Sequence, residues 1–177
     1  MSMPTPIPKF QSNEYIEEFA EGAIVYGENL KKIVDICLGE GSRKSNTGGF
    51  SDEKAIEFDK VAWAMKTDGN RSADLVTIIG KKTLLIADAK FRSKTGSDVQ
   101  QKPEKVREKY QKTREILMEN PKFQDMSLSF HERMIVVFPE LKNFPQIERK
   151  LRQLTEKPKI APFTLSGFYK EFFNTQK

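Results

Sequence analysis

Two apolar runs joined by a short glycine-containing link constrain the fold of this chain more than any other feature. The runs cover residues 74–79 and 83–90, and the link between them is Gly80-Lys81-Lys82. Runs of this length, rich in β-branched residues and joined by a glycine-initiated turn, are typical of an antiparallel β-hairpin. The sequence therefore predicts two paired strands near the middle of the chain.

The register of this hairpin brings charged residues together. If Ile79 pairs with Thr83, Asp74 lies directly opposite Asp88. Opposed residues have Cβ atoms about 4.5–5.5 Å apart, so two like charges there destabilise the hairpin unless a cation, such as an oxygen-bound divalent metal, lies between them. Lys90 points to the same side as Asp88, because side chains alternate along a strand. We therefore expect two carboxylates and one ammonium at a single point.

Composition limits the class of protein. With 177 residues, 31% of them charged and 37% hydrophobic, the chain is expected to form one domain over residues 1–177. Within it we expect an extended arm over 1–12, a flexible loop over 39–52 and a helical C-terminal extension over 156–177.

No apolar run approaches the ~20 residues that cross a bilayer, and the start lacks the apolar stretch of a signal peptide. A single cysteine fits a reducing compartment, so we expect a cytoplasmic protein without a membrane partner. One histidine and one cysteine cannot build a zinc site.

Positive charge is concentrated in one segment. Residues 81–114 contain eleven basic and four acidic residues, a net charge of +7 in a chain whose total is +5. Such a run is equally typical of a solvated helix face, but its position beside the acidic hairpin favours contacts with phosphate. The candidates for those contacts are Arg92, Lys94, Lys105 and Lys109.

The remaining periodicity predicts the order of the elements. Apolar residues at helical spacing predict one long helix over 13–38, and alternation predicts a strand over 55–66 before the hairpin. Pro103 suits the first turn of a helix reaching residue 119, and 133–138 is typical of a buried strand. Two further helices are expected over 145–155 and 165–173. The predicted order is helix, three antiparallel strands, helix, strand, then helices.

This order, with acids on the second and third strands, resembles the PD-(D/E)XK nuclease superfamily, the fold of many restriction endonucleases and Holliday-junction resolvases. The resemblance lies in Ser72-Ala-Asp74-Leu-Val followed by Ile86-Ala-Asp88-Ala-Lys90, and at the level of architecture it covers roughly residues 14–138. Ala73 stands where the name-giving proline would be, a position that is often replaced and is not a ligand. The resemblance implies an α/β (α+β) fold with a restriction-endonuclease-like αβββαβ core, a central mixed sheet flanked by helices, and extra C-terminal helices.

The resemblance also implies a reaction and a set of site residues. Asp74 and Asp88 would hold one or two Mg²⁺ or Mn²⁺ ions, with the backbone carbonyl of Ala89 as a further ligand. Lys90 would orient the attacking water or help to deprotonate it. Phosphodiester cleavage needs this combination of a metal, a hydroxide and charge stabilisation.

Members of the family commonly add a glutamate from the first helix. Glu28 is the candidate here, because Gly27 before it would let the helix approach the sheet closely, and Glu21 is the alternative. A solvated position for Glu28 remains equally open. Some relatives also use a glutamine near the scissile phosphate, and Gln100 and Gln101 are the candidates, unless their loop directs them into water.

The leading hypothesis is therefore a metal-dependent endonuclease that hydrolyses DNA by water attack on phosphorus. Its expected partner is DNA. The protein is expected to act as a homodimer or within a larger nucleoprotein complex. The alternative is a catalytically weak nucleic-acid-binding subunit of the same fold in a larger defence, repair or mobile-element complex. A scaffold protein with a basic helix is the third possibility, and it predicts no salt-sensitive DNA binding.

Overall fold

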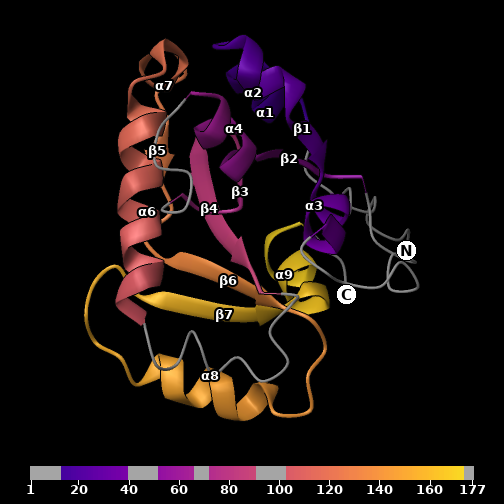
Figure 1. Ribbon diagram of the computed structural model, residues 1–177, viewed down its shortest axis with the longest axis vertical. Coiled ribbons are helices and arrows are strands. Elements are labelled where there is room, and N and C mark those ends of the chain that lie inside the picture. The colour runs from indigo at the N-terminus through magenta and orange to yellow at the C-terminus, as the bar shows by residue number, and fades with distance from the viewer. Residues whose placement is uncertain (1–12, 40–51, 66–71, 91–102, 174–177) are drawn as a thin grey trace, which may run out of the picture.

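The predicted hairpin forms the centre of a mixed β-sheet (Figure 1). The computed structural model describes residues 13–39, 52–65, 72–90 and 103–173. Strand β3 (Leu75–Ile79) pairs antiparallel with β4 (Thr83–Ala89), and Ile79 lies opposite Thr83. Gly80 begins the turn with a φ of 60°, a left-handed conformation that favours glycine. The register inferred from the sequence is therefore confirmed.

The sheet extends to both sides of this hairpin. On one side β2 (Lys54–Glu57) pairs with β3, and β1 (Leu30–Lys32) pairs with β2, both antiparallel. On the other side β6 (Met134–Phe138) runs parallel to β4, and β7 (Ile160–Thr164) runs parallel to β6. The short strand β5 (Ser129–Phe130) pairs with the start of β4. The protein thus has an α+β fold with an open mixed sheet of seven strands flanked by helices, as expected at this level.

Alternate residues of the central strands pack into two separate cores. Val76, Ile78, Leu84 and Ile86 face one core, whereas Leu75, Leu85 and Ala87 face the other. The first core is completed by α1 (Glu14–Ala20), α2 (Ile24–Glu28), α4 (Phe58–Ala64), α6 (Pro103–Met118) and α8 (Phe144–Arg152). The second is completed by α3 (Ile33–Gly39) and α9 (Leu165–Phe172). Both faces of β4 are therefore buried, which makes its end a protected place for charged groups.

Helix α6 positions the site, and its beginning matches the prediction. It begins at Pro103, a residue suited to the first turn because its missing N–H needs no partner there. Its buried residues recur at helical spacing and comprise Val106, Tyr110, Thr113, Ile116 and Leu117. The short helix α7 (Pro121–Asp125) follows it. One face of α6 therefore packs against the sheet along its length.

The long helix predicted over 13–38 is wrong. The chain instead forms α1, α2, the strand β1 and then α3. Ala23 has an extended backbone (φ −156°, ψ 141°) that separates α1 from α2. At Gly22, an added Cβ would lie 2.1 Å from Asn120 Oδ1. Contacts with residues distant in the sequence therefore interrupt the predicted helix. The local spacing of apolar residues does not predict such contacts.

The strand predicted over 55–66 is also wrong beyond Glu57. Residues 58–64 form α4, and the buried residues Phe58, Val61 and Ala62 follow helical spacing. Their aromatic and β-branched character resembles that of a strand, so the short apolar run was ambiguous. Three consecutive antiparallel strands still exist in β2, β3 and β4, with α4 inserted after the first of them.

The segment 156–177 is not a purely helical extension. Its residues 160–164 form β7, which pairs with β6, and only 165–172 form the expected helix α9. Helix α8 ends at Arg152 rather than at residue 155. The arm expected over 1–12 lies outside the described residues, as do residues 40–51 of the expected loop. Within the described ranges, no helix has the length and apolar character needed to cross a bilayer.

Candidate metal and phosphate site

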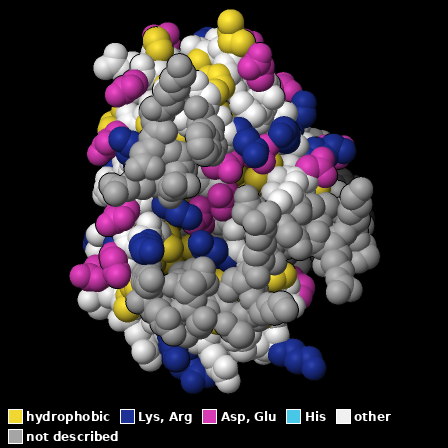
Figure 2. Space-filling model, in the orientation of Figure 1, with side chains coloured by type: hydrophobic (Ala, Val, Ile, Leu, Met, Phe, Trp, Pro, Cys, Tyr) yellow, Lys and Arg dark blue, Asp and Glu magenta, His cyan; other side chains and the backbone are white. Residues whose placement is uncertain are grey.

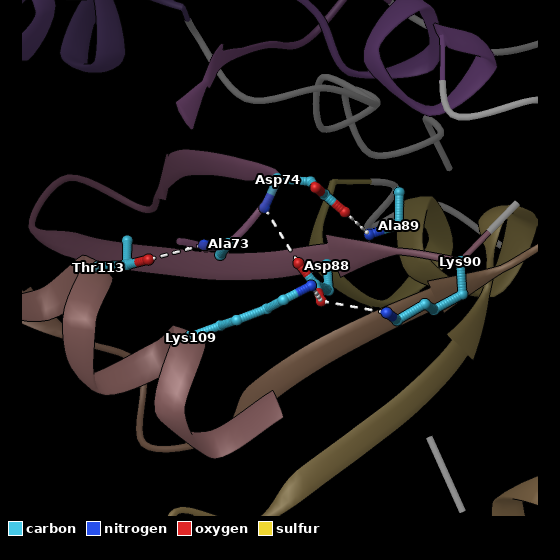
Figure 3. A network of polar contacts seen from close by, with 7 residues as sticks. All are labelled: Ala73, Asp74, Asp88, Ala89, Lys90, Lys109 and Thr113. Atoms are coloured by element: carbon cyan, nitrogen blue, oxygen red, sulfur yellow. Dashed lines mark hydrogen bonds and ion pairs between the residues drawn. The ribbon is translucent and has the colours of Figure 1, made fainter. Parts of the chain in front are cut away.

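Asp74 and Asp88 meet at the end of the hairpin, as the register requires. The Asp74 backbone N–H donates to Asp88 Oδ1 at 3.1 Å, and the Ala89 N–H donates to Asp74 Oδ2 at 2.8 Å (Figure 3). Each carboxylate therefore accepts a hydrogen bond from the backbone of the opposite strand. Bonds of this kind to an ionised acceptor are stronger than neutral ones, so they help to hold two acidic side chains at one point.

Asp88 is the most deeply buried charged group of the site. Its side chain is 0% exposed, and its Oδ2 atom lies 3.0 Å from Lys109 Nζ and 3.6 Å from Lys90 Nζ. The lysine side chains are 23% and 19% exposed, so both ammonium groups reach inward from the edge of the site. Two cations thus compensate the buried carboxylate, as burial of a charge requires.

Lys90 occupies the place that the sequence predicted. Its side chain lies on the same side of the strand as that of Asp88, because the two side chains form an ion pair (Figure 3). Its backbone N–H donates to the Val137 carbonyl oxygen of β6 at 2.8 Å. The neighbouring Ala89 packs into the opposite core. The parallel strand β6 therefore fixes the backbone from which the Lys90 side chain extends.

Helix α6 is fixed against the hairpin by a second polar contact. The Ala73 N–H donates to Thr113 Oγ1 at 2.9 Å, and both residues are fully buried. Thr113 lies one helical turn after Lys109, so the two residues point to the same side of α6. A proline at position 73 would have no N–H to donate. Ala73 thus takes part in docking the helix that carries Lys109.

Charges of both signs gather around this point. Figure 2 shows acidic side chains next to Lys and Arg side chains near the middle of the face on which β4 ends in Figure 1. Asp59 lies on α4 and follows Phe58, whose N–H donates to the Asp74 carbonyl oxygen at 2.9 Å. Burial raises the pKa of Asp59 above its ordinary value, with the nearby Glu57 adding to the effect.

The glutamates predicted on the first helix do not join the two aspartates. Glu28 is exposed at the end of α2, and Glu21 forms an ion pair of 3.9 Å with Lys122 of α7. Gly27 is exposed as well, and an added Cβ would approach only the Ala20 carbonyl oxygen, at 3.9 Å. The close approach to the sheet expected at Gly27 is therefore wrong. Its premise was the single long helix, which does not exist.

The basic residues predicted to contact phosphate have separate outcomes. Lys109 pairs with Asp88, whereas Lys105 is exposed one turn earlier on α6. Arg92, Lys94, Gln100 and Gln101 lie outside the described residues. Phosphate contact by Lys105 thus stays a prediction.

Sequence reasoning missed the partner of Lys109 and the role of Thr113. A signal for Thr113 existed, because it is the polar member of an otherwise apolar stripe formed by Val106, Tyr110 and Leu117. A polar side chain in a buried stripe needs a hydrogen-bond partner. No comparable signal identified Asp88 as the partner of Lys109, because that contact depends on how α6 lies across the sheet.

The donor set fits a hard divalent cation in part. Carboxylate and carbonyl oxygens suit Mg²⁺ and Mn²⁺, and Mg²⁺ is commonly bound by one or two carboxylates together with waters and substrate phosphates. Asp74 and Asp88 supply two such carboxylates. Among the residues that the structure describes, no three His, Cys, Asp or Glu form a group that could hold a metal ion. Any metal here would thus depend on two protein carboxylates and on ligands beyond them.

Comparison with protein-family models, curated proteins and solved structures finds no match to this chain. Membership of the PD-(D/E)XK superfamily therefore stays a prediction from the sequence motifs.

Proposed function

We propose that this protein is a divalent-metal-dependent endonuclease that hydrolyses phosphodiester bonds of DNA. The observation that carries the proposal is the fully buried Asp88 at the end of β4, paired with Lys90 and Lys109 beside Asp74. Buried ion pairs contribute little net stability, because desolvation offsets most of the Coulomb attraction. A cluster of four charged residues around a fully buried carboxylate is therefore better explained by chemistry than by folding.

The order of the elements supports the restriction-endonuclease-like fold as part of this proposal. The antiparallel strands β2, β3 and β4 are followed by α6 and then by β6, which lies beside β4 and runs parallel to it. Apart from α4, which follows β2, this order resembles the βββαβ part of the predicted core. The acids lie at the junction of its second and third strands, as the resemblance implies.

In this proposal each residue of the site has a separate role. Asp74 and Asp88 would hold Mg²⁺ or Mn²⁺, with the Ala89 carbonyl as a further ligand, and Lys90 would orient the attacking water. When bound, such a cation supplies a more acidic water and neutralises charge on the phosphate. The backbone bonds to both aspartates keep their carboxylates in place before substrate arrives. Preorganisation of this kind lowers the cost of reaching the transition state.

A second candidate function is favoured by one specific observation. Within the described ranges the two aspartates lack a third acidic partner of metal-binding geometry, and Asp88 already contacts two ammonium groups. This arrangement fits a nucleic-acid-binding subunit of the same fold with weak or no catalysis. Calorimetric titration with Mn²⁺ separates the two, since a module without a metal site gives no saturable heat.

The decisive experiment measures cleavage of plasmid DNA by the purified protein with Mg²⁺ or Mn²⁺. Asp88→Asn preserves the shape of the side chain and an acceptor for the Asp74 N–H, and Lys90→Ala removes the ammonium together with the side chain beyond Cβ. Each variant is expected to lose about 100-fold or more of the rate, the usual size of such contributions. Lys150→Ala, at an exposed position on α8, is the control and retains the parent rate. Cleavage by both site variants at the parent rate would refute the nuclease.

The same assay with chelator and with other substrates defines the reaction further. Excess chelator is expected to abolish cleavage, and addition of Mn²⁺ is expected to restore it. Single-stranded DNA, branched DNA and RNA are offered in parallel. Cleavage that persists in chelator would contradict a metal-dependent mechanism.

A further inference from the structure

The contact between Lys109 and Asp88 joins two elements that are distant in the sequence. Lys109 extends from α6 and places its Nζ 3.0 Å from Asp88 Oδ2, which is closer than the 3.6 Å of Lys90 Nζ from the same oxygen. The sequence predicts that Lys109 contacts phosphate. In the structure its ammonium lies against the carboxylate expected to bind metal (Figure 3).

The direction of the Lys109 side chain is determined by the packing of α6. Tyr110, the next residue, is buried and donates from its hydroxyl to the His131 carbonyl oxygen at 2.6 Å. Thr113, one turn later, accepts the Ala73 N–H at 2.9 Å. These two contacts fix the rotation of the helix about its axis. Lys109 therefore points toward the hairpin because of the way its helix is anchored.

An ammonium and a divalent cation compete for one carboxylate oxygen. Both are positive, so their repulsion at a separation of a few ångströms is strong where water is largely excluded. Asp88 is fully buried and the Lys109 side chain is only 23% exposed, so solvent screens the two charges only in part. Asp88 Oδ1 already accepts the Asp74 N–H, and Lys109 contacts Oδ2. A divalent cation that binds Oδ2 must therefore move the Lys109 ammonium away or share the oxygen with it at a large cost.

We propose that Lys109 is a resident counter-ion of Asp88 that a divalent metal displaces. Lys109 thereby lowers the metal affinity of the site while it stabilises the buried carboxylate in the absence of metal. Once displaced, its ammonium lies at the edge of the site, where the phosphate of a substrate is the complementary anion. Lys109 is thus a positioning residue that links metal binding to phosphate binding. This inference rests on the proposed metal site at Asp74 and Asp88.

The test is calorimetric titration of Mn²⁺ into the parent protein and four variants, with no substrate present. Lys109→Gln is expected to bind Mn²⁺ about tenfold more tightly than the parent, because one competing charge is gone. Lys109→Arg keeps the charge and is expected to bind like the parent. Lys112→Gln removes a charge from the same helix and serves as the matched control, with unchanged affinity. Asp88→Asn is expected to abolish the saturable heat.

A purely structural role for Lys109 predicts the opposite direction, since loss of packing weakens a metal site. Equal or weaker Mn²⁺ binding by Lys109→Gln, beside normal binding by the parent, would overturn this inference and leave the metal site intact. Absence of saturable heat in both proteins would overturn the metal site itself, and the inference with it. If Lys109→Gln does not fold, Lys109→Met provides a neutral side chain of similar length, with the same expected tightening.

Discussion

Replacement of Thr113 by valine tests the contact that docks α6 on the hairpin. The Thr113 hydroxyl accepts the Ala73 N–H at 2.9 Å, and both residues are fully buried. Valine has nearly the same shape and helix propensity as threonine, so it leaves little cavity and changes the helix little. Thr113→Val therefore isolates the loss of one buried hydrogen-bond acceptor.

The expected loss of stability arises because the buried Ala73 N–H loses its acceptor. A buried N–H without an acceptor destabilises a protein by about 1–3 kcal/mol. For a chain of this size, each kcal/mol lowers the melting temperature by about 2–4 °C. Thr113→Ser retains the hydroxyl and loses one methyl group, a transfer cost of about 0.8 kcal/mol. The serine variant is also expected to keep the Ala73 amide hydrogen-bonded, which the valine variant does not.

Urea unfolding followed by circular dichroism measures these differences, and hydrogen exchange of the Ala73 amide reports the bond itself. A double-mutant cycle sharpens the result, because a chain with Ala73→Pro has no N–H at this position. In that background Thr113→Val is expected to cost less than about 0.5 kcal/mol, the limit of ordinary additivity. If Thr113→Val matches the parent in stability and in Ala73 exchange, this account of α6 docking is wrong.

Two further predictions concern the N-terminal helices. Gly22→Ala is expected to destabilise the protein by about 1–2 kcal/mol, because the new Cβ would lie 2.1 Å from Asn120 Oδ1, which caps α7 by accepting the Lys122 N–H. Gly27→Ala, with its nearest contact at 3.9 Å, is the control and should be neutral or slightly stabilising in thermal unfolding. Burial raises the pKa of Tyr26 to about 12, whereas the unfolded phenol ionises near its ordinary value of 10.0. The neutral phenol is thus favoured by folding, and stability should fall by up to about 3 kcal/mol as pH rises from 10 toward 12. Tyr26→Phe should show a shallower decline over that range in urea titrations, and identical slopes would contradict the assignment.

Local periodicity was sufficient to predict the hairpin and the half of the site that lies on it. The alternation along 83–90 placed Lys90 beside Asp88, and the glycine turn fixed Asp74 opposite Asp88. The start of α6 at Pro103 and the strand at 134–138 were also predicted from the sequence. In each case the pattern depends on residues close together in the sequence, whose geometry the backbone repeats impose.

Local periodicity failed where a distant segment decides the conformation. Residues 30–32 have the apolar spacing of a helix but form β1, because Leu30 pairs with Ile56 of β2. Residues 160–164 form β7 through pairing with β6. The close approach expected at Gly27, which supported the choice of Glu28, was wrong for the same reason, since it was derived from a helix that the tertiary contacts interrupt. Pairing between strands that are distant in the sequence cannot be recognised from the residues of one strand alone.

The charges that the hairpin presents therefore follow from local pattern, since a period of two and a turn of fixed length leave one register. Which cation contacts them depends on the packing of distant elements. Lys109 reaches Asp88 because α6 crosses the sheet with Thr113 bonded to Ala73, a contact between residues 40 positions apart. Such contacts are selected by the packing of whole elements, and burial then makes the charges compensate one another.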